Sequence, residues 1–182
     1  MSNILILNGS PRKKGNTAIL LDSFVNGAKR KGHNVSRFDL HFMNIHPCIG
    51  CLQGGNNNDN PCTQNDDMKE IYPVYKEADI VVFASPLYFW NFTSQLKGAI
   101  DRLYAVTEEY GKTPKKEAML FVAAEGTTPS NYAPMVMYYE STLKHLRWKD
   151  KGQLFVGEVH HIGDIKGRKE LDKAYQIGMN IK

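Results

Sequence analysis

The sequence predicts an α/β protein with three layers, in which helices cover both faces of a doubly wound parallel sheet. Strand-length apolar runs recur at regular intervals, and segments with helical spacing separate them. One run, Ile80–Ala84, is apolar without alternation, as expected for a strand buried on both faces of a parallel sheet. Because crossovers between parallel strands are right-handed, repeated β-α units wind into such a sandwich.

Five apolar runs predict the strands of this sheet, each followed by a polar or glycine-rich segment. In chain order they are Ile4–Leu7, Val35–Leu40, Ile80–Ala84, Ala118–Ala124 and Leu154–Val159. This gives the β-α unit five times, without an internal repeat or a linker that would divide the chain. We therefore expect one domain, residues 1–182.

Helical spacing of apolar residues fills the intervals between these strands. Asn65 or Asp66 is expected to cap the second helix, and Pro73 is expected to bend it because proline removes a helical hydrogen bond. The residues that carry the spacing are Leu20, Phe24 and Ala28; Ile71, Val74, Tyr75 and Ala78; Leu96, Ala99, Ile100 and Leu103; and Met135, Tyr139, Leu143 and Leu146.

Length and charge exclude several classes of protein. The chain has 182 residues and a net charge of +4, from 23 Lys and Arg against 19 Asp and Glu, with the basic residues scattered. This balance suits small anionic ligands and gives little support for a nucleic-acid partner. No apolar run has the length of a membrane span, and the first residues lack the features of a secretory signal.

One connection breaks the regular pattern. Residues 41–65 show no periodicity and contain all three cysteines, Cys48, Cys51 and Cys62. Loops of more than about 15 residues in compact domains are usually functional or disordered. An odd number of cysteines without a secretory signal argues against a disulfide scaffold and for a reducing compartment, so we expect a cytoplasmic protein.

The stretch NGSPRKKGNT, residues 8–17, joins the first strand to the first helix. It lacks the G-x-G-x-x-G spacing of a dinucleotide site, and Lys14 stands where a nucleotide-triphosphatase loop needs its second glycine. What remains is a strand, a sharp turn at Gly9 and a helix N-terminus, where unsatisfied N–H groups and the helix dipole favour an anion.

These residues predict a site for a phosphate monoester. Ser10, Asn16 and Thr17 offer hydroxyl and amide donors, and Arg12 adds a cationic fork that suits a phosphate. An alternative stays open, in which Ser10 or Thr17 only caps the helix and the basic side chains are solvated. We call residues 8–17 the phosphate loop.

A second unusual loop follows the third strand, in the stretch ASPLYFWNFTSQLKGAIDR, residues 84–102. In a sheet of order 2-1-3-4-5, ligands bind beyond the carboxyl ends of strands one and three, so both loops reach one crevice. Pro86 ends the strand, and Leu87–Trp90 supply apolar and aromatic surface suited to a planar ring. Asn91 or Thr93 can cap the next helix. Alternatively, the aromatic residues pack beneath the loop or at a subunit interface.

The segments GSPRKKGNT, PCIGC with its later cysteine, DDM and SPLYFWNFTSQLKGAIDR together resemble the NAD(P)H-dependent FMN reductases of flavodoxin-like fold. The similarity covers residues 3 to 104, and the nearest branch includes the iron–sulfur flavoproteins. The resemblance implies FMN as cofactor, NAD(P)H as co-substrate and often a homodimer with the flavin at the interface. It assigns FMN binding to Ser10, Arg12, Gly15, Asn16, Thr17, Pro86, Leu87, Tyr88, Phe89, Glu125 and Gly126.

The cysteines depart from the pattern of the iron–sulfur branch. Cys48-x2-Cys51 resembles the start of its cluster motif, but the third cysteine position is Gly54, which leaves only Cys62. A cubane cluster normally needs four thiolates, and zinc would lack a ligand unless His41 or His46 served. A redox-active C-x-x-C pair is the other alternative. We favour three free thiols and expect no metal. We interpret His160 and His161 as surface residues.

The function that these features favour is an FMN-dependent oxidoreductase, which passes electrons from NAD(P)H through FMN to a small acceptor such as a quinone, nitro compound or flavin. No acid–base residue is nominated, because the flavin supplies the chemistry. A flavodoxin-like electron carrier is the alternative, although such carriers are usually strongly acidic and this chain is basic. A flavin-based redox-sensing module is a third. The sequence does not distinguish NADH from NADPH or identify the acceptor.

Overall fold

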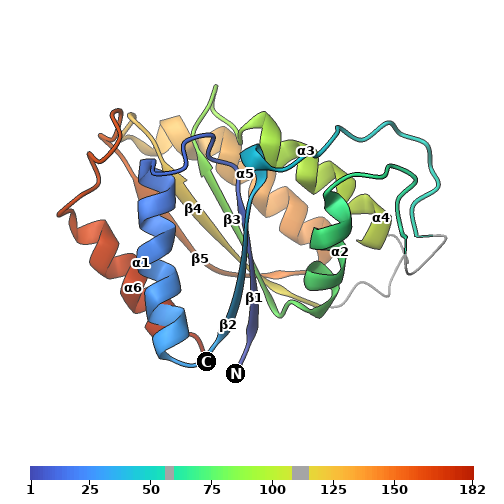
Figure 1. The fold of residues 1–182 in the computed structure, drawn as a ribbon. Helices are drawn as coiled ribbons and strands as arrows, with labels where there is room; N and C mark the ends of the chain where they lie inside the picture. Colours follow the sequence, from blue (N-terminus) through green and yellow to red (C-terminus); the bar gives the residue numbers. More distant parts are fainter. Residues whose placement is uncertain (56–59, 108–114) are drawn as a thin grey trace.

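The computed structural model describes residues 1–55, 60–107 and 115–182. A five-stranded parallel sheet of order β2-β1-β3-β4-β5 forms its centre (Figure 1). The strands are β1 (Asn3–Asn8), β2 (Asn34–Asp39), β3 (Ile80–Pro86), β4 (Glu117–Ala123) and β5 (Lys149–Val156). The helices are α1 (Asn16–Arg30), η1 (Leu40–Phe42), α2 (Met68–Glu77), α3 (Ser94–Arg102), α4 (Tyr104–Thr107), α5 (Pro129–Leu146) and α6 (Lys169–Met179).

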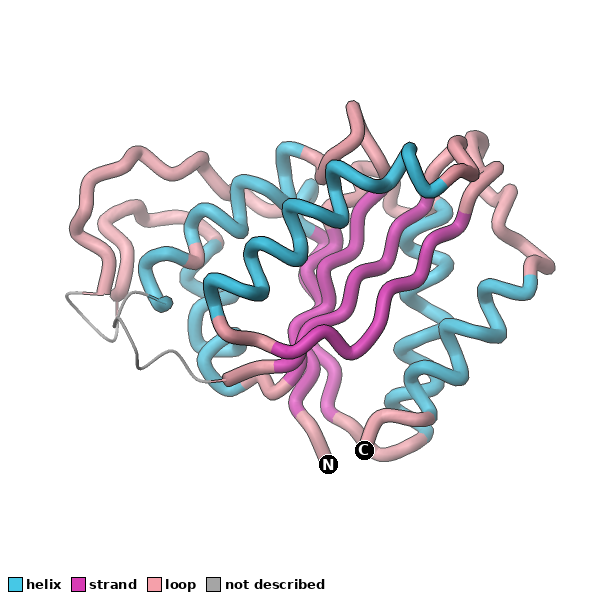
Figure 2. Tube along the Cα trace, turned by 180° about the vertical axis from the view of Figure 1, so that it is seen from behind, coloured by secondary structure: helices cyan, strands magenta, loops and turns pink. Residues whose placement is uncertain are grey.

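Helices cover both faces of the sheet, which confirms the predicted three-layer flavodoxin-like sandwich (Figure 2). Alternate residues of β1 explain how: Leu5 and Leu7 join the core beneath α2, α3 and α5, whereas Ile4 and Ile6 join the core beneath α1 and α6. Since all four side chains are buried, residues 4–7 of β1 present no polar face on either side of the sheet.

Helices α1 and α6 cross at two glycines. A Cβ atom at Gly27 would clash with the carbonyl oxygen of Tyr175, and one at Gly178 would clash with the carbonyl oxygen of Phe24. The backbones therefore approach more closely than any other residue type would allow. This contact joins the first helix of the chain to the last.

Two element boundaries differ from the sequence predictions. The fifth strand was expected at Leu154–Val159 but is Lys149–Val156. Glu158 has a φ of 55°, in the left-handed region, and this turn ends the strand before Val159. The N-cap position of the second helix is Asp67, one residue after the predicted Asp66, but Asp67 makes no side-chain cap hydrogen bond, whereas Asp66 accepts one from the N–H of Met68 at 3.2 Å. Pro73 lies inside that helix as expected.

Asp66 forms a buried ion pair. Its Oδ2 lies 2.6 Å from Nη1 of Arg102 and its Oδ1 lies 2.9 Å from Nη2, with side chains 0% and 1% exposed. Asp66 also accepts hydrogen bonds from the backbone N–H groups of His46 and Met68, and Arg102 donates to the carbonyl of His46. This pair fastens the segment from η1 to α2, residues 43–67, against α3. We call that segment the cysteine loop.

Burial alone would raise the pKa of Asp66. The Arg102 guanidinium and the N–H groups of His46 and Met68 outweigh burial and hold that pKa below its ordinary value.

Among the described helices, none combines the length and apolar character needed to span a bilayer.

Candidate functional site

The loops after β1 and β3 are joined directly by hydrogen bonds. The N–H of Gly9 donates to the carbonyl of Ala84 at 2.8 Å, and Oγ1 of Thr93 donates to the carbonyl of Gly9 at 2.8 Å. A Cβ atom at Gly9 would lie 2.7 Å from Cβ of Leu96, so only glycine fits this turn. Thr93 is also the N-cap of α3, one of the two caps expected there. The crevice between strands one and three is therefore a fixed structure.

Asn8 positions the start of the phosphate loop, and the sequence analysis missed it. Its buried side chain accepts a hydrogen bond from the N–H of Ser10 at 3.1 Å and donates to Oδ1 of Asp39 at 2.7 Å. Asp39 also accepts a hydrogen bond from Arg37 at 2.8 Å. A polar residue at the end of an otherwise apolar strand was the available signal, since a buried amide needs partners.

The N-terminus of α1 is suited to an anion. Gly15 is its N-cap and receives no side-chain cap, and the first turn has no acidic residue. The first helical hydrogen bond runs from Ile19 to Gly15 at 3.0 Å, so the N–H groups of residues 16–18 precede the helical ladder. A Cβ at Gly15 would lie 2.8 Å from Cβ of Arg12, so the loop closes only around glycine. These features fit a phosphate group.

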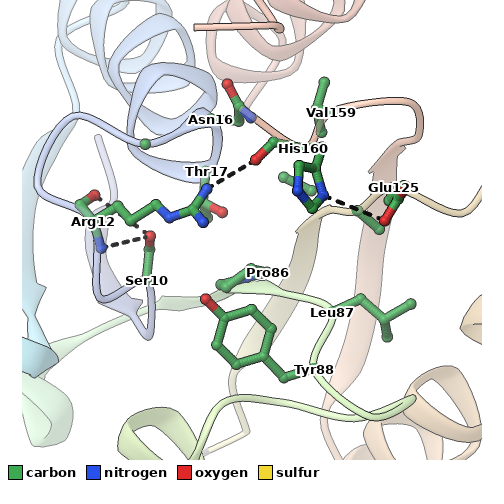
Figure 3. Close-up of a pocket in the computed structure, with 13 residues that line it drawn as sticks. Ser10, Arg12, Asn16, Thr17, Pro86, Leu87, Tyr88, Glu125, Val159 and His160 are labelled. Atoms are coloured by element: carbon green, nitrogen blue, oxygen red, sulfur yellow. Dashed lines mark hydrogen bonds and ion pairs between the residues drawn. The ribbon is translucent and has the colours of Figure 1, made fainter. Parts of the chain in front are cut away.

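Two of the expected phosphate ligands contact the loop between β5 and α6 in this structure. Nη1 of Arg12 donates to the carbonyl of His160 at 2.9 Å, which leaves the other guanidinium donors for a ligand (Figure 3). The Asn16 side chain donates to the carbonyl of His161 at 2.9 Å and accepts from the N–H of Gly163 at 3.0 Å. It also accepts from the N–H of Ile165. Asn16 thus braces this loop, and its backbone N–H is the group directed to an anion.

The second wall of the crevice comes from the loop after β3. Pro86, Leu87 and Tyr88 line the cavity, and the N–H of Leu87 is held by the carbonyl of Ala123 at 3.1 Å. Phe89 was expected to contact the flavin ring as well. It is 94% exposed and lies outside the cavity lining.

A tight turn explains the position of Phe89. Tyr88 and Asn91 pair through two backbone hydrogen bonds of 3.0 Å, and the residues between them, Phe89 and Trp90, have φ values of 46° and 60°. Two successive left-handed residues define a type I′ turn, which normally prefers Asn-Gly. The aromatic side chains are therefore held at the tip of a strained hairpin.

The loop after β4 contributes Glu125 to the cavity but not Gly126. Nδ1 of His160 lies 3.3 Å from Oε2 of Glu125, and both side chains line the opening (Figure 3). Gly126 instead packs against Asn131, and its carbonyl accepts a hydrogen bond from the hydroxyl of Tyr132. His160 is exposed, as expected of a surface residue, and it also lines this cavity. Asp164 holds that turn by accepting hydrogen bonds from the N–H groups of His160 and His161.

The phosphate loop, the loop after β3 and the loop after β4 thus surround one cavity of about 250 Å³. Its lining comprises Ser10, Arg12, Gly15, Asn16, Thr17, Pro86, Leu87, Tyr88, Ala123, Ala124, Glu125, Val159 and His160. Ala123, Val159 and His160 carry no sequence pattern that indicates a ligand, because they are small, aliphatic and solvated residues, respectively. One concave site with an anion-binding end and an apolar wall matches the shape of a phosphorylated planar cofactor.

Comparison with known families identifies the family of this chain. Residues 2–149 match the NADPH-dependent FMN reductase family. The chain belongs to that family. The family is one of flavoprotein oxidoreductases, and its cofactor is FMN, whose single phosphate fits the N-terminus of α1 described above.

Individual relatives agree with this assignment. An iron–sulfur flavoprotein of Archaeoglobus fulgidus is 33% identical over 95% of this chain and 76% of its own length. An iron–sulfur flavoprotein of Methanocaldococcus jannaschii is 34% identical, over 54% of this chain and only 50% of that protein. The structure of an NAD(P)H:quinone oxidoreductase from Methanothermobacter marburgensis superposes with a TM-score of 0.76 at 21% identity, covering 97% of this chain and 94% of the other. At that identity the superposition shows a common fold.

The names of these relatives imply an iron–sulfur cluster, which the residues of this chain do not fit. Gly54 occupies the position expected for a third cysteine, and a Cβ there would lie 2.9 Å from Cα of Ala105 and 3.1 Å from Tyr104. A cysteine at position 54 would thus collide with α4. Within the described ranges, no group of three His, Cys, Asp or Glu side chains is arranged to hold a metal ion.

Proposed function

We propose that this protein oxidises a reduced nicotinamide through bound FMN and passes the electrons to a small acceptor such as a quinone, a nitro compound or a flavin. The observation that supports this most directly is the meeting of two loops at one cavity. The phosphate loop supplies the anion-binding end, and Pro86–Tyr88 supply an apolar wall that remains open to solvent on one side.

Each part of the cavity has a distinct proposed role. Ser10, Thr17 and the N–H groups at the start of α1 bind the phosphate, and Arg12 neutralises its charge. Pro86, Leu87 and Tyr88 exclude water from one face of the ring, with Glu125 and His160 at its polar edge. When bound, FMN supplies the redox chemistry, and the protein contributes position and electrostatics. This assignment names no acid–base residue.

The open side of the cavity distinguishes this proposal from an electron carrier. Tyr88 is 44% exposed beside the cavity, so a nicotinamide or an acceptor can approach the bound ring. Phe89 and Trp90 lie next to this opening and are also exposed, which supports a homodimer with the hairpin near the interface. A single domain, the cytoplasmic location and the dimer stay predictions.

Flavin analysis followed by an anaerobic titration tests the proposal. The purified or reconstituted protein should contain one FMN per chain and little FAD, because the loop has donors for one phosphate. Stepwise addition of NADH or NADPH without oxygen should bleach the oxidised-flavin absorbance, and steady turnover should follow when a quinone is added. Extraction of FAD, or a flavin that neither nicotinamide reduces, would refute the proposal.

A further inference from the structure

The described part of the cysteine loop lies on the side of the sheet away from α1 (Figure 1). A second cavity, of about 280 Å³, is lined by residues of this loop, of the end of α3 and of α4. All three thiols line it, together with Arg102 and residues of α4. It shares no lining residue with the flavin cavity. The cysteines are free of disulfides, and Cys48 and Cys51 are exposed. This cavity therefore gathers thiols, two of them exposed, at a place separate from the cavity beside the phosphate loop.

We propose that Cys48 and Cys51 form a dithiol that exchanges with low-molecular-weight disulfides, with Cys51 as the attacking thiol and Cys48 as the resolving thiol. The inference does not depend on FMN binding or on the oxidoreductase activity. It gives the cysteine loop a role other than holding a cluster. A cysteine at position 54, which would be the fourth cluster ligand, has no room beside α4.

Cys51 has the surroundings of a reactive thiol. Its Sγ lies 3.5 Å from Oγ1 of Thr63. Hydrogen bonds from that hydroxyl and from the backbone N–H of Gln53 lower the pKa of Cys51, and the positive charge of Arg102 acts in the same direction. Because the thiolate is the nucleophile in disulfide exchange, an exposed cysteine with a lowered pKa reacts first.

Arg102 provides a fixed positive charge at this cavity. Its Nη atoms are held by Asp66 and by the carbonyl of His46, while its Nε is buried and has no partner among the described residues. The side chain is 1% exposed and lines the cavity. Arg102 and the three cysteines line the same cavity, and its charge acts on Cys51 and Cys62, so this buried cation is the second observation that favours anionic sulfur here.

Cys48 is a better resolving thiol than Cys62. Only two residues separate Cys48 from Cys51, and Gly50, with a φ of 64°, turns the chain between them. Cys62 is less exposed than Cys48 and lies eleven residues after Cys51. Closing the short Cys48–Cys51 ring orders little additional chain.

The reaction balances without a further reagent. The Cys51 thiolate attacks one sulfur of a disulfide RSSR, the S–S bond breaks, and RS⁻ leaves. The Cys48 thiol gives its proton to that RS⁻ and attacks the sulfur of Cys51, which expels the second RS⁻ to take up a proton from water. Two protein thiols, one of which began as a thiolate, are oxidised to one disulfide, and RSSR is reduced to two RSH.

Mass spectrometry of the full-length protein after anaerobic incubation with glutathione disulfide tests this order of events. The parent protein should lose two titratable thiols and contain a Cys48–Cys51 disulfide. Cys48→Ser should accumulate a mixed disulfide with glutathione at Cys51, and Cys51→Ser should form no internal disulfide. Cys62→Ser is the matched control and should react like the parent.

Other outcomes would overturn the proposal. Glutathione attached first to Cys48 or Cys62, or equal rates at all three cysteines, would show that Cys51 is not the attacking thiol. Iron and acid-labile sulfide in stoichiometric amounts would show that a cluster occupies the loop. The rate of Cys51 alkylation against pH gives an independent readout, and its midpoint should lie below that of a model thiol.

Discussion

The phosphate loop and the cysteine loop leave the carboxyl ends of neighbouring strands, yet they are held in different ways. The phosphate loop is short and is held at many points: Asn8 bonds to Asp39, and other residues bond to the loop after β3 and to the loop between β5 and α6. The cysteine loop is long, and a buried ion pair, Asp66 with Arg102, anchors it to α3. We therefore expect the loss of one hydrogen bond in the phosphate loop to cost less stability than the loss of this buried pair.

The largest effect is expected from breaking that anchor. Arg102→Met should lower the free energy of unfolding by about 3–5 kcal/mol, because Asp66 would remain as a buried charge without its partner. Urea denaturation measures the change. Lys97→Met on the same helix removes the exposed Lys97–Asp101 pair and should cost at most about 0.5 kcal/mol.

A double variant keeps this test informative if Arg102→Met alone does not fold. Asp66→Asn with Arg102→Met removes both charges and should be less destabilised than the sum of the single variants. Additive losses would mean that the two side chains stabilise the loop independently.

The Asp66–Arg102 pair should also make the folding stability fall at low pH. The pKa of Asp66 is lowered in the folded protein, so the contribution of the pair is complete above the unfolded carboxyl pKa of about 3.9 and is lost as the pH falls through the lower folded value. Urea midpoints measured downward from about pH 6 should fall more steeply for the parent than for Asp66→Asn. Parallel curves of urea midpoint against pH for the two proteins would show that Asp66 does not cause the acid dependence.

A smaller and more local effect is expected in the phosphate loop. Arg12→Ala should weaken FMN binding by about 1.5–3 kcal/mol through the lost bond to a charged phosphate, without a comparable loss of folding stability. Riboflavin, which lacks the phosphate, should bind the variant and the parent almost equally. Lys14→Ala, a neighbouring exposed cation, is the control, and equal losses for both ligands would place Arg12 away from the phosphate.

A substitution in the hairpin after β3 is expected to stabilise the fold. Replacing Phe89 and Trp90 by Asn and Gly relieves two left-handed residues and should stabilise the fold by roughly 1–2 kcal/mol. If the aromatic side chains serve the acceptor side of the cavity, the Michaelis constant for a quinone should rise in the same variant. Lower stability would show that the rings pack against the protein in solution.

The smallest effect is expected on flavin reduction when the cysteine loop is changed, because that loop and the phosphate loop line different cavities. Cys48→Ser with Cys51→Ser should leave the stopped-flow rate of flavin reduction by NADPH largely unchanged, since the two cavities have no lining residue in common. A collapse of that rate while FMN stays bound would show that the loops cooperate.

The sequence predicted the fold and the two loops at the crevice because both depend on local patterns. Apolar runs define strands, and glycines at positions 9 and 15 allow turns in which no side chain fits. The phosphate loop and Pro86–Tyr88 were found in this way.

What the sequence did not predict depends on long-range contacts. His160 reaches the cavity only through the turn held by Asp164, and Asp66 pairs with a residue 36 positions away. Nor does any local pattern reveal the left-handed turn that places Phe89 outside the cavity lining.

The hydrogen bonds between the Asn16 side chain and the loop before α6 have a consequence for biosynthesis. The partners of that side chain, His161, Gly163 and Ile165, follow 145 to 149 residues later, and the family match at residues 2–149 ends before them. On the ribosome, the phosphate loop is synthesised about 145 residues before its supporting turn. Nascent chains stalled before residue 160 should therefore fail to retain FMN.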